Sequence, residues 1–124
     1  NRSKKTICIV EDMADVWAFE RSGYHKGLYH VIGGLLSAAK NFTEQDLKLN
    51  KLRERIEINQ VQEIILALSA TIEGQTTALV IKDALESLNI KITQLAYGVP
   101  VGSEIHYLDD NTLGAALESR KNLG

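Results

Sequence analysis

The sequence predicts an α/β fold in which a mostly parallel sheet is covered by helices on both faces. Short apolar runs typical of buried strands alternate with segments whose apolar residues recur at helical spacing. The clearest strands are residues 6–10 and 63–68, and each leads into a turn that opens a helix. Strands that alternate with helices are joined by crossover connections, which make them parallel neighbours in one sheet. With 124 residues, the chain is long enough for one hydrophobic core.

The helix after the first strand is expected over residues 13–22. Asp12 is a favourable cap at its start, and Gly23 ends it. One side of this helix is formed by residues at helical spacing, namely Met13, Val16, Trp17 and Glu20. We expect this side, with Trp17, to face the core. The next strand is expected over residues 28–32.

The middle of the chain predicts two further helices. Thr43 and Asp46 have the spacing of a capping box and indicate the start of a helix. Its apolar positions are Leu47, Leu49, Leu52 and Ile56. The strand over 63–68 is followed by a helix over 74–88, for which Asn89 is a suitable left-handed terminator.

The end of the chain is expected to form a separate C-terminal segment. A strand over 91–96 completes the main domain, which we assign to residues 1–97. Residues 98–124 then predict a glycine- and proline-containing turn, a short strand over 104–108 and a helix that begins at Asn111.

The charge of the chain limits how it can bind nucleic acid. Fourteen Lys and Arg against sixteen Asp and Glu give a formal net charge of −2. Because nucleic acids are polyanions, any DNA contact must come from a local basic patch. The candidates lie on the middle helix: Lys48, Lys51, Arg53 and Arg55. The alternative is that these residues form an ordinary solvated helix face.

Cysteine usage and hydropathy indicate the compartment. Cys8 is the single cysteine, so neither an internal disulfide nor a thiolate zinc site can form within this sequence. A reducing cytosol is the default, and we expect a cytoplasmic protein. We find no apolar run near the ~20 residues of a membrane span and no secretory leader. Because the sequence starts at Asn1, we expect it to be a piece of a longer protein.

Two glutamates are the candidate functional residues. Glu11 follows the first strand and Glu73 follows the strand over 63–68, and ligands bind at the carboxyl ends of parallel strands. The two are candidates for weak magnesium binding, but the positions where a phosphotransfer site would add aspartates hold Ser69 and Thr71. The structural alternative is that acidic residues here favour the positive ends of helix dipoles.

Several strings together resemble a known family over the whole chain. A glutamate at one strand end and Glu73-Gly74 at another resemble the Toprim fold. More specific strings resemble the bacterial recombination mediator family RecR: Gly27-Leu28-Tyr29-His30-Val31-Ile32-Gly33-Gly34, Gly98-Val99-Pro100-Val101-Gly102, and matches within residues 67–78 and 107–117. The chain departs from the usual family pattern at Ser69, Ala70 and Gln75.

The resemblance implies a non-enzymatic scaffold in DNA repair. Members of the family carry a helix-hairpin-helix region and a four-cysteine zinc finger ahead of the Toprim domain, so zinc is expected only in such an N-terminal part. They form dimers and tetramers that clamp DNA, and they work with RecO and RecF to load RecA at single-strand gaps. The resemblance assigns partner binding to Glu11 and Glu73 and subunit assembly to the C-terminal segment.

Two other functions remain open at this stage. A magnesium-dependent Toprim nuclease or primase-like enzyme would use the same glutamates, and the missing aspartates argue against it. A nucleotide-binding domain would use the crevice at the strand ends, and the lack of a phosphate-loop signature argues against it.

Overall fold

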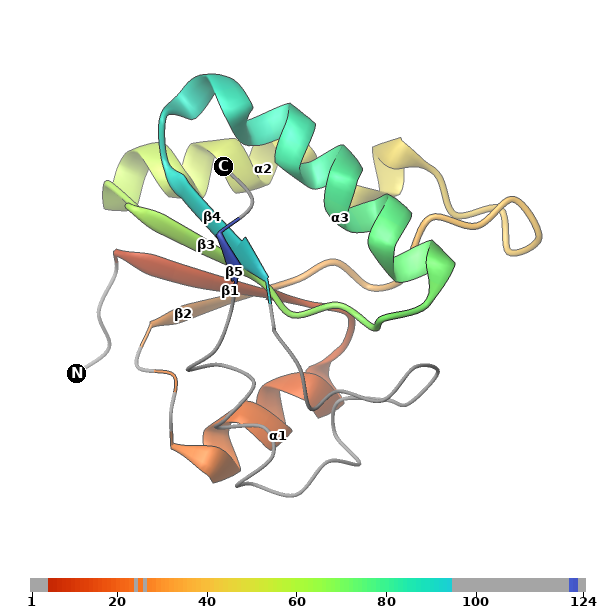
Figure 1. The fold of residues 1–124 in the computed structure, drawn as a ribbon, viewed down its shortest axis with the longest axis horizontal. Helices are drawn as coiled ribbons and strands as arrows, with labels where there is room; N and C mark the ends of the chain where they lie inside the picture. The colour runs from red at the N-terminus through yellow and green to blue at the C-terminus, as the bar shows by residue number, and fades with distance from the viewer. Residues whose placement is uncertain (1–4, 24, 26, 95–120, 123–124) are drawn as a thin grey trace.

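The computed structural model describes residues 5–23, 25, 27–94 and 121–122, and it contains a five-stranded sheet (Figure 1). The strand order is β2-β1-β3-β4-β5. The strands are β1 (Thr6–Val10), β2 (Leu28–Val31), β3 (Glu63–Leu66), β4 (Lys91–Gln94) and β5 (Lys121–Asn122). The first four strands are mutually parallel, and β5 pairs antiparallel with β4. The predicted α/β fold with a mostly parallel sheet is therefore confirmed.

Helices cover both faces of the sheet, as the sequence predicts. In Figure 1, α2 (Leu49–Asn59) and α3 (Ile72–Leu85) lie on one face and α1 (Met13–Ser22) on the other. Successive strand residues point to opposite faces. Accordingly Ile7 and Ile64 are buried in the core beneath α2 and α3, whereas Cys8 is buried with Phe19 of α1 in the core on the other face.

The predicted core face of α1 was wrong. Trp17 is 62% exposed, whereas Ala18, Phe19 and Asp15 are buried. Asp15 faces inward because it completes a capping box: its carboxylate accepts a hydrogen bond from the backbone N–H of Asp12 (3.2 Å), and the Asp12 carboxylate accepts one from the backbone N–H of Asp15 (3.2 Å). The cap thus fixes which side of the helix is buried.

The helix predicted to begin after Thr43 is divided into two. A 3₁₀ helix, η1 (Glu44–Leu47), starts with the expected cap, in which the Thr43 backbone N–H donates to the Asp46 carboxylate (2.8 Å). Lys48 then adopts a left-handed conformation (φ 55°), and α2 begins at Leu49. A left-handed residue interrupts the i to i+4 hydrogen-bond pattern, so η1 and α2 do not form one continuous helix.

The other boundaries differ from prediction by a few residues. Strand β3 ends at Leu66 rather than residue 68, and α3 begins two residues before the expected start. A short 3₁₀ helix, η2 (Glu86–Leu88), extends α3, and Asn89 is left-handed (φ 54°) as predicted.

Part of the prediction lies outside the described residues, namely residues 95–97, the strand over 104–108 and the helix beginning at Asn111. Strand β5 was not predicted. No helix in the described ranges has the length and apolar character needed to cross a membrane.

Candidate functional site

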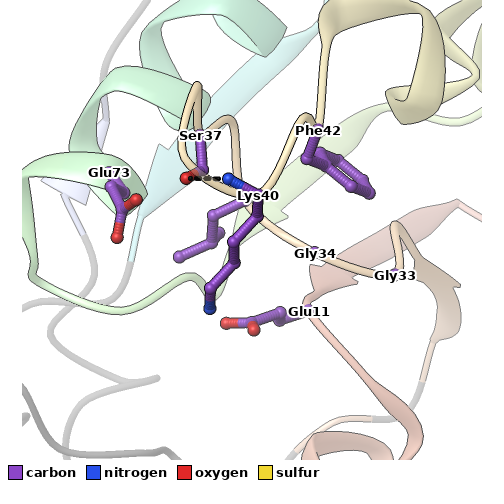
Figure 2. A pocket seen from close by; sticks show the side chains of 8 residues that line it. Glu11, Gly33, Gly34, Ser37, Lys40, Phe42 and Glu73 are labelled. Carbon is purple, nitrogen blue, oxygen red and sulfur yellow. Dashed lines mark hydrogen bonds between the residues drawn. The ribbon is translucent and has the colours of Figure 1, made fainter.

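The carboxyl ends of β1 and β3 open onto one pocket of about 190 Å³ (Figure 2). Glu11 and Glu73, which follow different strands in the sequence, both line it. The described residues that line it are Glu11, Gly33, Gly34, Leu35, Ser37, Lys40, Phe42 and Glu73. The two glutamates identified in the sequence therefore share a single site, together with a lysine that the sequence analysis did not single out.

Glu11 is placed by the pairing of β1 with the segment after β2. The parallel register continues beyond the strands, because Ile32 N–H donates to the Val10 carbonyl (3.0 Å) and Gly33 N–H donates to the Glu11 carbonyl (2.8 Å). Gly33 has a φ of 85°, a conformation that favours glycine, and it turns the chain along the pocket wall. The backbone of Glu11 is thus fixed, and its half-buried side chain reaches the pocket.

Glu73 is placed by the tight loop between β3 and α3. The hydroxyls of Ser69 and Thr71 are 2.8 Å apart, and Thr71 Oγ1 accepts a hydrogen bond from Gly74 N–H (3.1 Å), which caps the helix. Gly74 lies so close to the loop that a Cβ there would overlap the Ser69 carbonyl oxygen. This packing puts Glu73 in the first turn of α3, where the helix dipole favours a negative charge.

Lys40 enters the pocket from the loop between β2 and η1. Ser37 and Phe42 form an isolated antiparallel bridge, with Ser37 N–H to the Phe42 carbonyl at 3.0 Å and Phe42 N–H to the Ser37 carbonyl at 2.9 Å. In Figure 2, the Lys40 side chain extends from this hairpin into the pocket, with its ammonium directed toward the Glu11 carboxylate.

The donor atoms around the pocket do not fit a catalytic magnesium centre. Magnesium in phosphotransfer sites requires several carboxylate or water oxygens in near-octahedral geometry. Within the described ranges, no group of three or more His, Cys, Asp or Glu side chains is placed to hold a metal ion. Ser69 and Thr71, at the positions where aspartates would add ligands, bond to each other and to the start of α3. The lysine adds a positive charge where a metal ion would need negative charge.

The four basic residues predicted to contact DNA have different environments. Arg53 donates from Nε (3.2 Å) and Nη2 (3.0 Å) to the carbonyl oxygen of Ala84, which joins α2 to α3. Arg55 Nη1 donates to the Tyr29 carbonyl oxygen at 2.8 Å. Lys48 and Lys51 are exposed. The two lysines are therefore available to a ligand, whereas the two arginines already make structural contacts.

His30 is a partly buried residue of β2 beside the same arginine. Arg55 Nη1 lies 3.1 Å from His30 Nδ1, which accepts the hydrogen bond in the neutral imidazole. Burial, together with the positive charges of Arg55 and Lys48, lowers the pKa of His30 to about 4. His30 is therefore neutral at physiological pH and supports the packing of α2 on the sheet edge.

Comparison with known proteins identifies the family. The family model of the Toprim domain matches residues 5–96, and a second model, described as RecR, C-terminal, matches residues 98–121. The chain is 50% identical over 120 residues to the recombination protein RecR of Parvibaculum lavamentivorans, covering 97% of this chain and 60% of that protein. The chain belongs to the RecR family. RecR of Dinoroseobacter shibae is 52% identical over 121 residues and RecR of Maricaulis maris 51% over 123, covering 98% and 99% of this chain and 61% of each relative.

These matches confirm the resemblance predicted from the sequence and the Toprim fold that it implies. The RecR-family chain spans about 60% of the length of the curated relatives that it matches. What the complete relatives do therefore applies to this chain only as a proposal.

Proposed function

We propose that this RecR-family chain acts in DNA recombination and repair as a non-enzymatic scaffold that binds other proteins and DNA. The observation that carries the proposal is the composition of the Toprim pocket, whose described lining contains two glutamates, one lysine and no third carboxylate. Such a pocket has the negative charge and the walls to bind a cationic group, but its described residues do not supply the ligands for metal-assisted phosphotransfer. Relatives named recombination proteins support the biological process.

The proposed partner of the pocket is a basic surface of RecO. Glu11 and Glu73 supply the negative charge, while Leu35 and Phe42 offer apolar walls against which the aliphatic part of a lysine or arginine side chain can pack. Charge complementarity of this kind mainly determines specificity and association rate. In this proposal the chain works with RecO and RecF, assembles into dimers or tetramers, and helps to load RecA at single-strand gaps.

Titration calorimetry with purified RecO tests the partner. We expect saturable binding by the wild-type chain and roughly tenfold weaker binding in Glu11→Gln and in Glu73→Gln, as expected when one charge of a close interfacial pair is removed. Glu54→Gln is the matched control, because Glu54 is exposed on α2 and does not line the pocket. Equal affinities of all three variants would place the interface elsewhere, and no binding by the wild type would reject RecO as a partner of this chain.

The proposed DNA contact is centred on the two exposed lysines of the middle helix region. Lys48 and Lys51 carry no structural hydrogen bonds of the kind that hold Arg53 and Arg55, so they can turn toward phosphates at little cost to the fold. Lys48→Gln and Lys51→Gln should each weaken binding to gapped DNA uniformly across sequences and reduce the salt-dependence slope by about one. An unchanged slope in the double variant would remove this surface from the DNA interface.

A nicking assay tests the non-enzymatic part of the proposal. Supercoiled DNA incubated with the chain and magnesium should remain intact. Magnesium-dependent nicking that disappears in Glu11→Ala would instead establish the Toprim nuclease function and overturn the scaffold proposal.

A further inference from the structure

We infer that Lys40 is the built-in cation of the Toprim pocket: its ammonium takes the part that a metal ion plays in such a pocket, and it selects against divalent ions. The inference concerns the chain alone and holds whichever partner binds the pocket. Pockets of this type ordinarily hold several carboxylates around a metal ion. The described lining of this pocket instead contains two glutamates and a lysine.

The backbone that carries Lys40 is held in place by several hydrogen bonds. The Ser37–Phe42 bridge closes the hairpin, and inside it the Ser37 hydroxyl accepts a hydrogen bond from Lys40 N–H (3.2 Å). Asn41 N–H donates to the Ala38 carbonyl (3.2 Å), and Asn41 adopts a left-handed turn conformation (φ 54°). Because the backbone at Lys40 is already ordered, placing its side chain in the pocket costs less conformational entropy than it would for a lysine on a flexible loop.

The hairpin is also tied to the elements that carry the glutamates. Leu36 N–H donates to Thr77 Oγ1 (2.9 Å), and the same hydroxyl donates to the Glu73 carbonyl oxygen (2.7 Å). Thr77 is fully buried on α3, so one hydroxyl connects the hairpin with the first turn of that helix. On the other wall, the Phe42 ring packs so closely on Gly34 that a Cβ there would lie 2.9 Å from Phe42 Cε2. The hairpin that carries Lys40 is therefore held both to α3 and to the segment that contains Gly34.

The charge that Lys40 adds has a direct consequence for ion selectivity. Among the described lining residues, the two glutamates contribute a formal charge of −2, and Lys40 brings the sum to −1. An ammonium several ångströms from an incoming divalent ion disfavours its binding by roughly tenfold, even when the interaction is screened as at a protein surface. Removing the charge of Lys40 should therefore give the pocket a higher affinity for divalent ions than the wild-type chain has.

Manganese titration followed by NMR tests this inference at the site itself. Paramagnetic Mn²⁺ broadens amide signals nearby, and the amides of Gly33 and Gly34 in the pocket lining report on occupancy. We compare the wild-type chain with Lys40→Gln and with the matched control Lys51→Gln, which changes the net charge equally at an exposed position outside the pocket. We expect the two glycine signals of Lys40→Gln to broaden at roughly tenfold lower Mn²⁺ than those of the other two proteins.

A further variant assigns the gained site to the glutamates. Adding Glu73→Gln to Lys40→Gln should restore the weak response of the wild-type chain. Equal broadening in Lys40→Gln and Lys51→Gln would overturn the inference, as would strong broadening already present in the wild type. Because RecO takes no part in this experiment, its outcome is independent of the proposed partner.

Discussion

Gly74→Ala separates two physical effects of opposite sign on the stability of the chain. Gly74 lies in the first turn of α3, and alanine is the better helix former by about 1 kcal/mol. Helix propensity alone therefore predicts that the substitution raises the free energy of unfolding.

Packing predicts the reverse. A Cβ at position 74 would overlap the Ser69 carbonyl oxygen and would lie 2.8 Å from Ser69 Oγ and 2.9 Å from the Ser69 carbonyl carbon. Two of these atoms belong to the backbone, so the loop itself must move, at a cost of about 1–3 kcal/mol. The movement also disturbs the hydrogen bond from Gly74 N–H to Thr71 Oγ1, a cap worth about 1 kcal/mol. After the propensity gain is subtracted, we expect a net destabilisation of about 2 kcal/mol.

Urea unfolding followed by circular dichroism measures the difference. Thr76→Ala is the control, since Thr76 is exposed on the same helix and only the propensity effect, a stabilisation of about 0.5 kcal/mol, is expected there. If Gly74→Ala is as stable as the wild type or more so, the close approach of loop and helix does not constrain this position, and the account of how Glu73 is placed fails.

Three further predictions concern the core and its polar contacts. Thr77→Val leaves the Leu36 N–H without its acceptor and should cost about 1–3 kcal/mol in urea unfolding, whereas Thr76→Val should change little. Because folding lowers the pKa of His30 from 6.5 to about 4, the native protein binds fewer protons than the unfolded chain between these pH values, and its free energy of unfolding should fall by roughly 1–2 kcal/mol from pH 6.5 to pH 4, after allowance for partial exposure. Urea unfolding of His30→Gln over the same pH range should lack this part of the loss. Phe19→Ala should cost about 3–5 kcal/mol, measured as a lower thermal midpoint, while Trp17→Ala should leave it nearly unchanged.

The sequence was sufficient to predict β1 and β3 because these two strands are short and nearly uniformly apolar. Residues 7–10 and 64–66 are buried from both faces, and such runs have few other interpretations. The helix faces were harder to predict. In α1, Trp17 and Phe19 are both large and apolar, so periodicity could not decide which faces inward. The buried cap residue Asp15 decides it, and a buried carboxylate is contrary to the usual hydrophobic pattern.

The glutamates of the pocket could be predicted from the sequence, whereas its lysine could not. Glu11 and Glu73 follow strands, so parallel topology alone brings them to one edge of the sheet. Lys40 lies in a loop, and its position depends on the contact between Leu36 and Thr77, which are 41 positions apart in the chain. No local sequence signal marks such a contact. Likewise, no glycine or asparagine marks the left-handed turn at Lys48 that separates η1 from α2.

The loop before α3 indicates why the Toprim fold does not require an aspartate at position 71. The fold needs a side-chain oxygen at position 71 to accept the Gly74 N–H, and serine, threonine, asparagine and aspartate all satisfy that need. A metal site needs the carboxylate specifically, because a neutral hydroxyl does not supply the negative charge that a divalent ion requires. Thr71 therefore caps α3 but does not supply a carboxylate for a metal ion. Because the fold does not depend on that carboxylate, the strand-end pocket can keep its shape with Lys40 in its lining.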